Sequence, residues 1–329
     1  MGTVRCRASW CFVGTMLAAF VVHLGNAHDA TPISNDKSPI PSTASRLISD
    51  TNPCTAKPLG EITVATLNNA PIITLLANGH PVVLLLDTGA NTTTLRPDVA
   101  ERIGAQPPRV QFQRQLHGIS STMAMREVEL RRFVAGGVSL PWRRVAVAPV
   151  TTAAVFSAPL DGLLGADVLS GFDIDLDIPH HRMTFYQKGS CPNGPPWNSR
   201  YVAIPVGQSA DRHLFFPVQL DGRTITGIID TGAQRSFLSE AAARSLGVTE
   251  AALARDPSSI TQGISAERLP SRMHRFSGLK IGSELIRDPE FAVGNAKLGG
   301  ADAILGIDFV LSRRIWLSYG SFAIFLSAR

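Results

Sequence analysis

The sequence predicts an all-β fold of two similar lobes related by a pseudo-twofold axis. Three observations predict it. The tetrapeptide Asp-Thr-Gly-Ala occurs twice, at residues 87–90 and 230–233, each time after an apolar run. Further landmarks follow both copies in the same order and at similar spacing. Most other apolar runs are short, β-branched and bounded by Gly, Pro or Asn, which is typical of strands. The chain therefore reads as a tandem duplication of one small rolled sheet.

The predicted elements follow the repeat. Short strands are predicted throughout both lobes, among them residues 81–86, 144–150 and 182–186. Helical signals are few. We expect one helix after each Asp-Thr-Gly-Ala turn, over residues 96–103 and 239–246. Brief helices are expected after Gly165 and Gly306, where an apolar pair and a glycine recur in both lobes.

The composition excludes several classes of function. Of 329 residues, 44% are hydrophobic and 17% charged, which favours a well-cored globular protein. Only 7% are aromatic, which argues against a base-stacking surface for single-stranded nucleic acid. The 31 basic residues, less Arg5 and Arg7 in a segment that we expect to be removed, leave 29 against 26 acidic ones. That balance is too mild for a nucleic-acid partner.

The N-terminal residues 1–27 resemble a secretory signal peptide. Arg5 and Arg7 precede an apolar run of 14 residues, and small residues lead to Ala27, where we expect cleavage. The run is shorter than the roughly 20 residues that cross a bilayer. We therefore expect an exported protein, periplasmic or secreted, with no stable membrane span after cleavage. The alternative is an uncleaved anchor.

Composition divides the remaining chain into four parts. Residues 28–56 are rich in Pro, Ser, Thr and Asp and predict a flexible leader. Residues 57–187 and 201–329 are the two predicted lobes, and the Pro/Gly-rich residues 188–200 are the linker between them.

Two cysteines remain once the predicted signal is removed. Cys54 and Cys191 each lie just ahead of a predicted lobe. In an oxidising compartment they can pair, which would tie the entry of the first lobe to the linker. The alternative is two free thiols.

The chemistry is expected at the two repeated acids. An acid directly after a buried strand is costly unless it has partners, and the sequence places one there twice, at Asp87 and Asp230. A pseudo-twofold axis would bring the two carboxylates face to face, where they share one proton and titrate as a unit. One can then act as a base on water while the other, protonated, polarises a carbonyl group.

At these residues the sequence resembles the retropepsin-like aspartic proteases of the wider pepsin group. Two apolar residues before Asp-Thr-Gly-Ala, a glycine-bearing flap segment and a later apolar pair with Gly all occur twice, over roughly residues 60–326. The resemblance implies a peptide or protein substrate, a catalytic pair Asp87 and Asp230, and neither cofactor nor metal. It implies residues that support this pair, namely Thr88, Gly89, Ala90, Thr231, Gly232 and Ala233. It also implies flap residues that bind substrate, namely His117, Gly118, Ile119, Gln262, Gly263 and Ile264.

Two departures from the family pattern matter. Retroviral enzymes of this type carry one lobe per chain, whereas this chain carries both, so we expect a monomer whose lobes pair internally. Pepsins usually have Ser or Thr after the glycine, but here Ala90 and Ala233 stand there, and neither flap segment contains Tyr. Loss of a hydroxyl that donates to a carboxylate raises its pKa, so we expect a mildly acidic optimum.

Other polar clusters receive structural interpretations. Asp173, Asp175 and Asp177 begin like a calcium loop, but the required Gly and Glu are missing. Their alternation with apolar residues favours a strand with one solvent face. His180 and His181 are expected at a hairpin turn, without nearby partners and with little support for a metal site. The paired arginines are expected on exposed strands and hairpins, at Arg131, Arg132, Arg143, Arg144, Arg313 and Arg314.

Two other functions remain open. One is a catalytically silent peptide-binding module on the same fold. The other is a glycosidase that uses two carboxylates. The duplicated turns argue against the glycosidase, because its two acids need not be related by symmetry.

Overall fold

The computed structural model describes residues 46–48, 54–109, 114–117, 122–141, 143–150, 160–262 and 268–328, all within one compact unit, Asp36–Arg329. The predicted signal peptide and most of the predicted leader lie outside the described residues. Strands dominate and every described helix is short, which confirms the all-β prediction.

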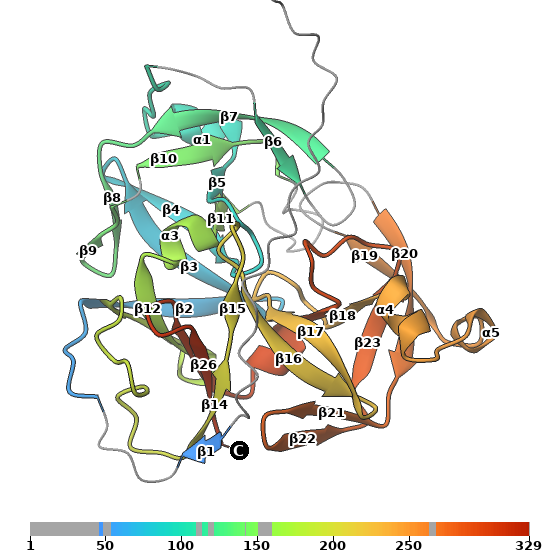
Figure 1. Cartoon of the computed structure of the whole chain (residues 1–329). Helices are drawn as coiled ribbons and strands as arrows, with labels where there is room; N and C mark the ends of the chain where they lie inside the picture. The colour runs from blue at the N-terminus through green and yellow to red at the C-terminus, as the bar shows by residue number, and fades with distance from the viewer. Residues whose placement is uncertain are drawn as a thin grey trace, which may run out of the picture. The chain divides into compact units, whose positions relative to one another are not determined.

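The N-terminal lobe contains strands and short helices in an order that the second lobe largely repeats (Figure 1). Its elements are β2 (Gly60–Leu67), β3 (Ala70–Ala77), β4 (His80–Leu86), β5 (Thr94–Leu95), α1 (Pro97–Arg102), β6 (Arg114–His117), β7 (Thr122–Glu129), β8 (Phe133–Ala135), β9 (Val138–Ser139), β10 (Arg144–Val147), β11 (Gly162–Leu164), α3 (Ala166–Leu169), β12 (Phe172–Asp177), the 3-10 helix η1 (Ile178–His180) and β13 (Arg182–Gln187).

The C-terminal lobe follows in yellow to red in Figure 1. Its elements are β14 (Tyr201–Pro205), β15 (Gly207–Gln208), β16 (Leu214–Leu220), β17 (Arg223–Ile229), β18 (Phe237–Ser239), α4 (Glu240–Ser245), α5 (Glu250–Leu253), β19 (Ser258–Gln262), β20 (Arg268–Arg275), β21 (Gly278–Ile281), β22 (Glu284–Arg287), β23 (Glu290–Gly294), β24 (Ala303–Leu305), α6 (Ile307–Val310), β25 (Arg314–Ser318) and β26 (Ala323–Ser327). Helices α1, α4, α3 and α6 form where the sequence predicted them.

Matching hairpins lead to the two repeated acids. Asn78 and Gly79 join β3 to β4, and Asp221 and Gly222 join β16 to β17, all four with positive φ. Asn-Gly and Asp-Gly suit such two-residue turns because both positions need the left-handed region. The side chain of Asn78 accepts backbone N–H groups from the connection between β7 and β8. The side chain of Asp221 likewise accepts the N–H groups of Ser277 and Gly278, where β20 leads into β21.

The registers of these hairpins are identical. Ile73 pairs with Leu84 in the first lobe, and Phe216 pairs with Gly227 in the second, a constant offset of 143 residues. On its other side, β4 pairs in parallel with β11, and β17 pairs in parallel with β24. Each strand that carries a repeated acid at its end therefore lies inside its sheet and is flanked by neighbours on both sides.

A sheet shared by both lobes joins them. Its strands run in the order β1, β14, β26, β25, β12, β13 and β2, so β12 of the first lobe pairs antiparallel with β25 of the second. Figure 1 shows β14 beside β26 in this sheet. Strand β1 (Arg46–Ile48) lies within the predicted leader and pairs with β14, so the leader is not structureless over these three residues.

The acids of β12 are buried, and the expected solvent face of this strand is wrong. Asp173, Asp175 and Asp177 are at most 3% exposed. Asp173 accepts backbone N–H groups of Gly189 at 2.9 Å and Gly320 at 3.0 Å. The strand is correct, but its polar side is covered by the linker and by the second lobe.

An ion pair crosses between the lobes at Asp175. Arg314 of β25 donates to its carboxylate from Nε at 2.8 Å and Nη2 at 2.5 Å, and the indole N–H of Trp197 donates at 3.0 Å. The Arg314 guanidinium also lies over the Trp197 ring. A buried carboxylate tolerates its burial when it is paired and hydrogen-bonded in this way.

Two further expectations need correction. Arg313 is 1% exposed rather than on a surface hairpin, and it pairs with Glu284 at 2.7 Å. His180 and His181 are at the hairpin turn as expected, but both have partners. His180 lies 2.7 Å from Asp177, and His181 lies 3.2 Å from the carbonyl oxygen of Val64.

A disulfide joins Cys54 to Cys191 across 137 residues of sequence. Cys191 is fully buried in a cluster that includes Trp197 and Trp316. The bond therefore anchors the linker and the segment before β2 on the shared sheet.

No helix in the described part of the chain is long and apolar enough to cross a membrane. Among the same residues, no cluster of three or more His, Cys, Asp or Glu side chains could hold a metal ion.

The Asp175→Asn substitution should lower the free energy of unfolding by about 3 kcal/mol, because it removes the nearer of the two carboxylates that pair with Arg314 and leaves only Asp177 at 3.6 Å. Urea unfolding measures this loss. Glu129→Gln is the matched control, since Glu129 pairs with Arg144 on the exposed surface. It should cost less than about 1 kcal/mol. Equal losses in the two variants would contradict the assigned role of the inter-lobe pair.

Candidate active site

The two repeated acids emerge at equivalent points of the two lobes. Asp87 follows β4, and its backbone N–H donates to the carbonyl oxygen of Leu164 in β11 at 3.0 Å. Asp230 follows β17, and its N–H donates to Leu305 in β24, also at 3.0 Å. The backbone of each acid is thus held by an interior strand of its sheet, which fixes the position of its Cα atom.

Each carboxylate is held by its own loop. The Oδ1 atom of Asp87 accepts the N–H groups of Gly89 at 3.0 Å and Ala90 at 2.9 Å. The loop of Asp230 repeats this arrangement at 2.8 Å and 3.2 Å. Such charge-assisted hydrogen bonds favour the ionised form of each acid and fix the orientation of its carboxylate.

The glycines explain how close the acids come. A Cβ atom at Gly89 would overlap the carboxylate of Asp230, and one at Gly232 would overlap that of Asp87. Each carboxyl group therefore lies against the loop of the opposite lobe. The structure brings Asp87 and Asp230 together as the sequence predicted.

Burial raises the pKa of both acids. For Asp87, which is 6% exposed, the negative charge of Asp230 and a side-chain hydrogen bond with it raise the pKa further, well above its usual range. For Asp230, burial also raises the pKa, but the N–H of Gly232, the hydrogen bond from Asp87 and the nearby His213 act against it. The two carboxyl groups therefore titrate as a pair, and one proton is held between them before the second group ionises.

The threonines of the two loops exchange hydrogen bonds across the lobe boundary. The hydroxyl of Thr88 donates to the carbonyl oxygen of Ile229 at 2.8 Å and accepts the N–H of Thr231 at 3.1 Å. The hydroxyl of Thr231 donates to Leu86 at 2.5 Å and accepts the N–H of Thr88 at 3.1 Å. Both side chains are buried. This exchange locks the ends of β4 and β17 together.

A second acid supports the loop beneath Asp87. The carboxylate of Asp167 accepts the N–H and hydroxyl of Thr93 at 2.8 and 2.6 Å. The hydroxyl of Thr93 accepts the N–H of Gly165 at 3.0 Å. A side chain at Gly165 would overlap the backbone of this loop.

The same support exists in the other lobe. Asp308 accepts the N–H and hydroxyl of Ser236 at 2.9 and 2.8 Å, and Ser236 accepts the N–H of Gly306 at 3.2 Å. Sequence analysis assigned no role to Asp167 or Asp308. Each acid comes two residues after the glycine of the repeated apolar pair, Gly165 or Gly306, and this recurrence was the signal that could have found them.

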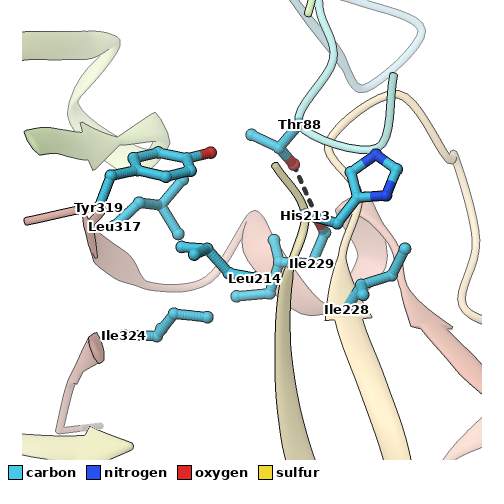
Figure 2. Close-up of a pocket in the computed structure, with 8 residues that line it drawn as sticks. All are labelled: Thr88, His213, Leu214, Ile228, Ile229, Leu317, Tyr319 and Ile324. Carbon is cyan, nitrogen blue, oxygen red and sulfur yellow. Dashed lines mark hydrogen bonds between the residues drawn. The ribbon is translucent and has the colours of Figure 1, made fainter. Parts of the chain in front are cut away.

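A small pocket lies under the threonine exchange, between the two lobes (Figure 2). Residues from both lobes line it, namely Thr88, His213, Leu214, Ile228, Ile229, Leu317, Tyr319 and Ile324. His213, which lines this pocket, is another residue that sequence analysis missed. No motif marks it, because it comes 17 residues before Asp230 at the start of an ordinary strand.

The flaps are described only in part. Hairpins β6–β7 and β19–β20 occupy equivalent places in the two lobes, with His117 and Gln262 at the ends of their first strands. The predicted tip residues Gly118, Ile119, Gly263 and Ile264 lie outside the described residues. Their contact with substrate stays a prediction.

The Thr88→Val substitution should lower the free energy of unfolding by about 1–3 kcal/mol, because the Thr231 N–H and the Ile229 carbonyl lose their buried partner. Thr88→Ser keeps the hydroxyl and should lose distinctly less. Chemical denaturation of both variants measures the difference, and equal losses would show that the cross-lobe hydrogen bonds contribute little.

Comparison with known proteins agrees with this geometry. The family model for aspartyl protease matches twice, at residues 73–168 and 216–309, which together span more than half of the chain. The comparison with curated proteins gives no match. Among solved structures, a retropepsin-like aspartic protease from Rickettsia conorii aligns at 19% identity and a TM-score of 0.30, over 38% of this chain and 89% of its own. On the two family-model matches, the chain belongs to the aspartyl protease family.

Proposed function

We propose that this protein is an aspartic endopeptidase that hydrolyses peptide bonds between its two lobes. The observation that carries the proposal is the pair Asp87 and Asp230, each held by its own loop and pressed against the loop of the other. Two carboxyl groups that share one proton supply an acid and a base at one place. Membership of the aspartyl protease family supports the same chemistry. It gives no support to the glycosidase alternative.

The proposed reaction needs only water and these two side chains. The ionised carboxylate removes a proton from a bound water molecule, whose oxygen forms a bond to the peptide carbonyl carbon. The protonated carboxyl gives its proton to the carbonyl oxygen, which yields a neutral tetrahedral intermediate. The carboxyl group that took the proton from water then gives it to the amide nitrogen, while the other, now ionised, carboxylate takes a proton from a hydroxyl of the intermediate. The C–N bond breaks to give the acid and the amine, and both carboxyl groups are back in their starting state.

The proposed substrate is an extended peptide. Hairpins β6–β7 and β19–β20 stand on the two lobes, and a peptide would bind beneath them as an added strand, held by backbone hydrogen bonds. We further propose that the protein acts as a monomer, since β12 and β25 already pair the lobes within one chain. Export to the periplasm or the exterior is proposed from the signal-like N-terminus, and a disulfide is typical of such compartments.

Replacement of Asp230 by Asn should abolish cleavage of an unfolded protein substrate, with a loss of at least about 100-fold, because the pair can no longer supply both acid and base. Protein purified after expression of the full chain is assayed with and without pepstatin. Asp98→Asn is the matched control, since Asp98 is exposed on α1 and away from the pair. Pepstatin-resistant cleavage that survives in Asp230→Asn contradicts the proposal. A folded wild type that cleaves no substrate favours the catalytically silent peptide-binding module.

The pH dependence should be bell-shaped with a mildly acidic optimum. The active form carries one proton, so activity appears as pH rises through the lower pKa of the pair and disappears above the higher one. Burial raises both pKa values, so the acidic limb should lie above about pH 4, the usual range of an aspartate. Initial rates across the pH range test this, and a rate that still rises toward pH 2 is incompatible with it.

A further inference from the structure

The disulfide lies in a cluster that covers the junction of the two lobes. Among the described strands, β12 and β25 form the one pairing that joins the lobes, and we call this pairing the seam. Asp175 of β12 is opposite Trp316 of β25, so both side chains point to the same face of the sheet. The buried members of the cluster on this face are Tyr186, Cys191, Trp197, Tyr201, Trp316 and Phe325, and Cys54 packs against them. The disulfide is therefore part of the packing at the seam.

The side chain of Trp197 connects the linker to both strands of the seam. Its indole N–H donates to Asp175 of β12 at 3.0 Å, and the guanidinium of Arg314 of β25 lies 4.9 Å from the centre of its ring. Asp175 and Arg314 also pair with each other. Trp197 follows Cys191 by only six residues, so the disulfide limits how far this part of the linker can move from the seam.

Strand β25 connects the cluster to the threonine exchange beside the acids. On one face of the strand, Trp316 packs against Tyr186 of the first lobe, with 4.8 Å between the ring centres. The next residue, Leu317, points to the opposite face. There it lines the small pocket together with Thr88 and Ile229, which are joined by a hydrogen bond between the lobes (Figure 2). The seam thus contacts the disulfide cluster on one face and the acid loops on the other.

The disulfide closes a loop that contains the whole first lobe. Cys54 and Cys191 are 137 residues apart in the sequence. A crosslink over such a span strongly restricts the chain, because the entropy lost on closing a loop grows with its length. Cleavage of the bond therefore removes the covalent restraint on two segments at once, namely the linker and the segment before β2.

We propose that the disulfide between Cys54 and Cys191 is a redox switch, which holds the two lobes in the register that the acid pair needs only while the bond is intact. This rests on the proposed proteolysis. Reduction releases the linker, Trp197 leaves the seam, and the lobes shift against each other. Each lobe stays folded, but Asp87 and Asp230 lose the close approach on which the proposed reaction depends. A chain that has not reached an oxidising compartment is therefore kept at low activity.

The switch is operated by thiol–disulfide exchange with a dithiol. A thiolate of the dithiol attacks the Sγ atom of Cys54, because Cys54 is partly exposed whereas Cys191 is fully buried. The S–S bond breaks, and Cys191 leaves as a thiolate that takes a proton. The second thiol of the reagent then attacks the mixed disulfide, releases Cys54 as a thiol and closes a cyclic disulfide. The protein gains two electrons and two protons, and the dithiol loses them.

The test reduces the folded wild type with dithiothreitol at neutral pH and then assays it at acidic pH, where exchange stops because the thiolate is protonated. The substrate is an unfolded protein without cysteine. Reduction should lower kcat/KM by about 10- to 100-fold, since small displacements of catalytic groups cost this much, and reoxidation should restore it. The matched control is the double variant Cys54→Ala with Cys191→Ala. It should have the low activity of the reduced wild type and should not respond to dithiothreitol.

A second measurement needs neither turnover nor a variant. Hydrogen exchange of the oxidised and reduced wild type, followed by mass spectrometry, should show faster exchange in β12, β25 and the linker, and unchanged exchange in the hairpins β3–β4 and β16–β17. Full activity after reduction, or unchanged exchange at the seam, contradicts the switch. Faster exchange throughout both lobes means that the bond only stabilises the whole fold, and the proposal is again wrong. An oxidised wild type without activity contradicts the proposed proteolysis instead, and exchange at the seam still decides whether the bond controls the lobes.

Discussion

The exchange of hydrogen bonds between Thr88 and Thr231 is the interaction on which the rest of the structure depends. Two carboxyl groups buried against each other repel when both are charged, and burial alone already disfavours their ionised forms. Each threonine therefore fastens its own loop to the strand end of the other lobe. Farther from the acids, the pairing of β12 with β25 in the shared sheet joins the same two lobes. The lobes are thus held together both at their acids and along a continuous sheet.

The repeated features could be read from the sequence because their signals are local. Asp-Thr-Gly-Ala follows an apolar strand twice, and the later landmarks recur at nearly the same offset. These signals predicted the two lobes, the meeting of Asp87 and Asp230, and the four short helices. Each of these features depends on residues close in sequence, or on a symmetry that the duplication itself reveals.

The features that sequence analysis missed depend on partners distant in the chain. The acids of β12 alternate with apolar residues, so the pattern favoured a solvent face. Their burial depends on Arg314 and Trp197, which come from the other lobe and the linker. Arg313 reads as a surface residue until Glu284 is placed beside it. His213 belongs to no motif, and its place in the pocket beside Thr88 depends on the other lobe.

The joining of both lobes in one polypeptide has a consequence for the peptide cleavage proposed above. A peptide has a direction, with different side chains on the two sides of the bond to be cut. A cleft formed by two copies of one short chain is the same from either end, because every mutation appears in both halves. Here the halves have already diverged, since Thr92 in the first acid loop corresponds to Arg235 in the second. If the proposed cleavage is correct, each half can therefore be selected for its own portion of the peptide.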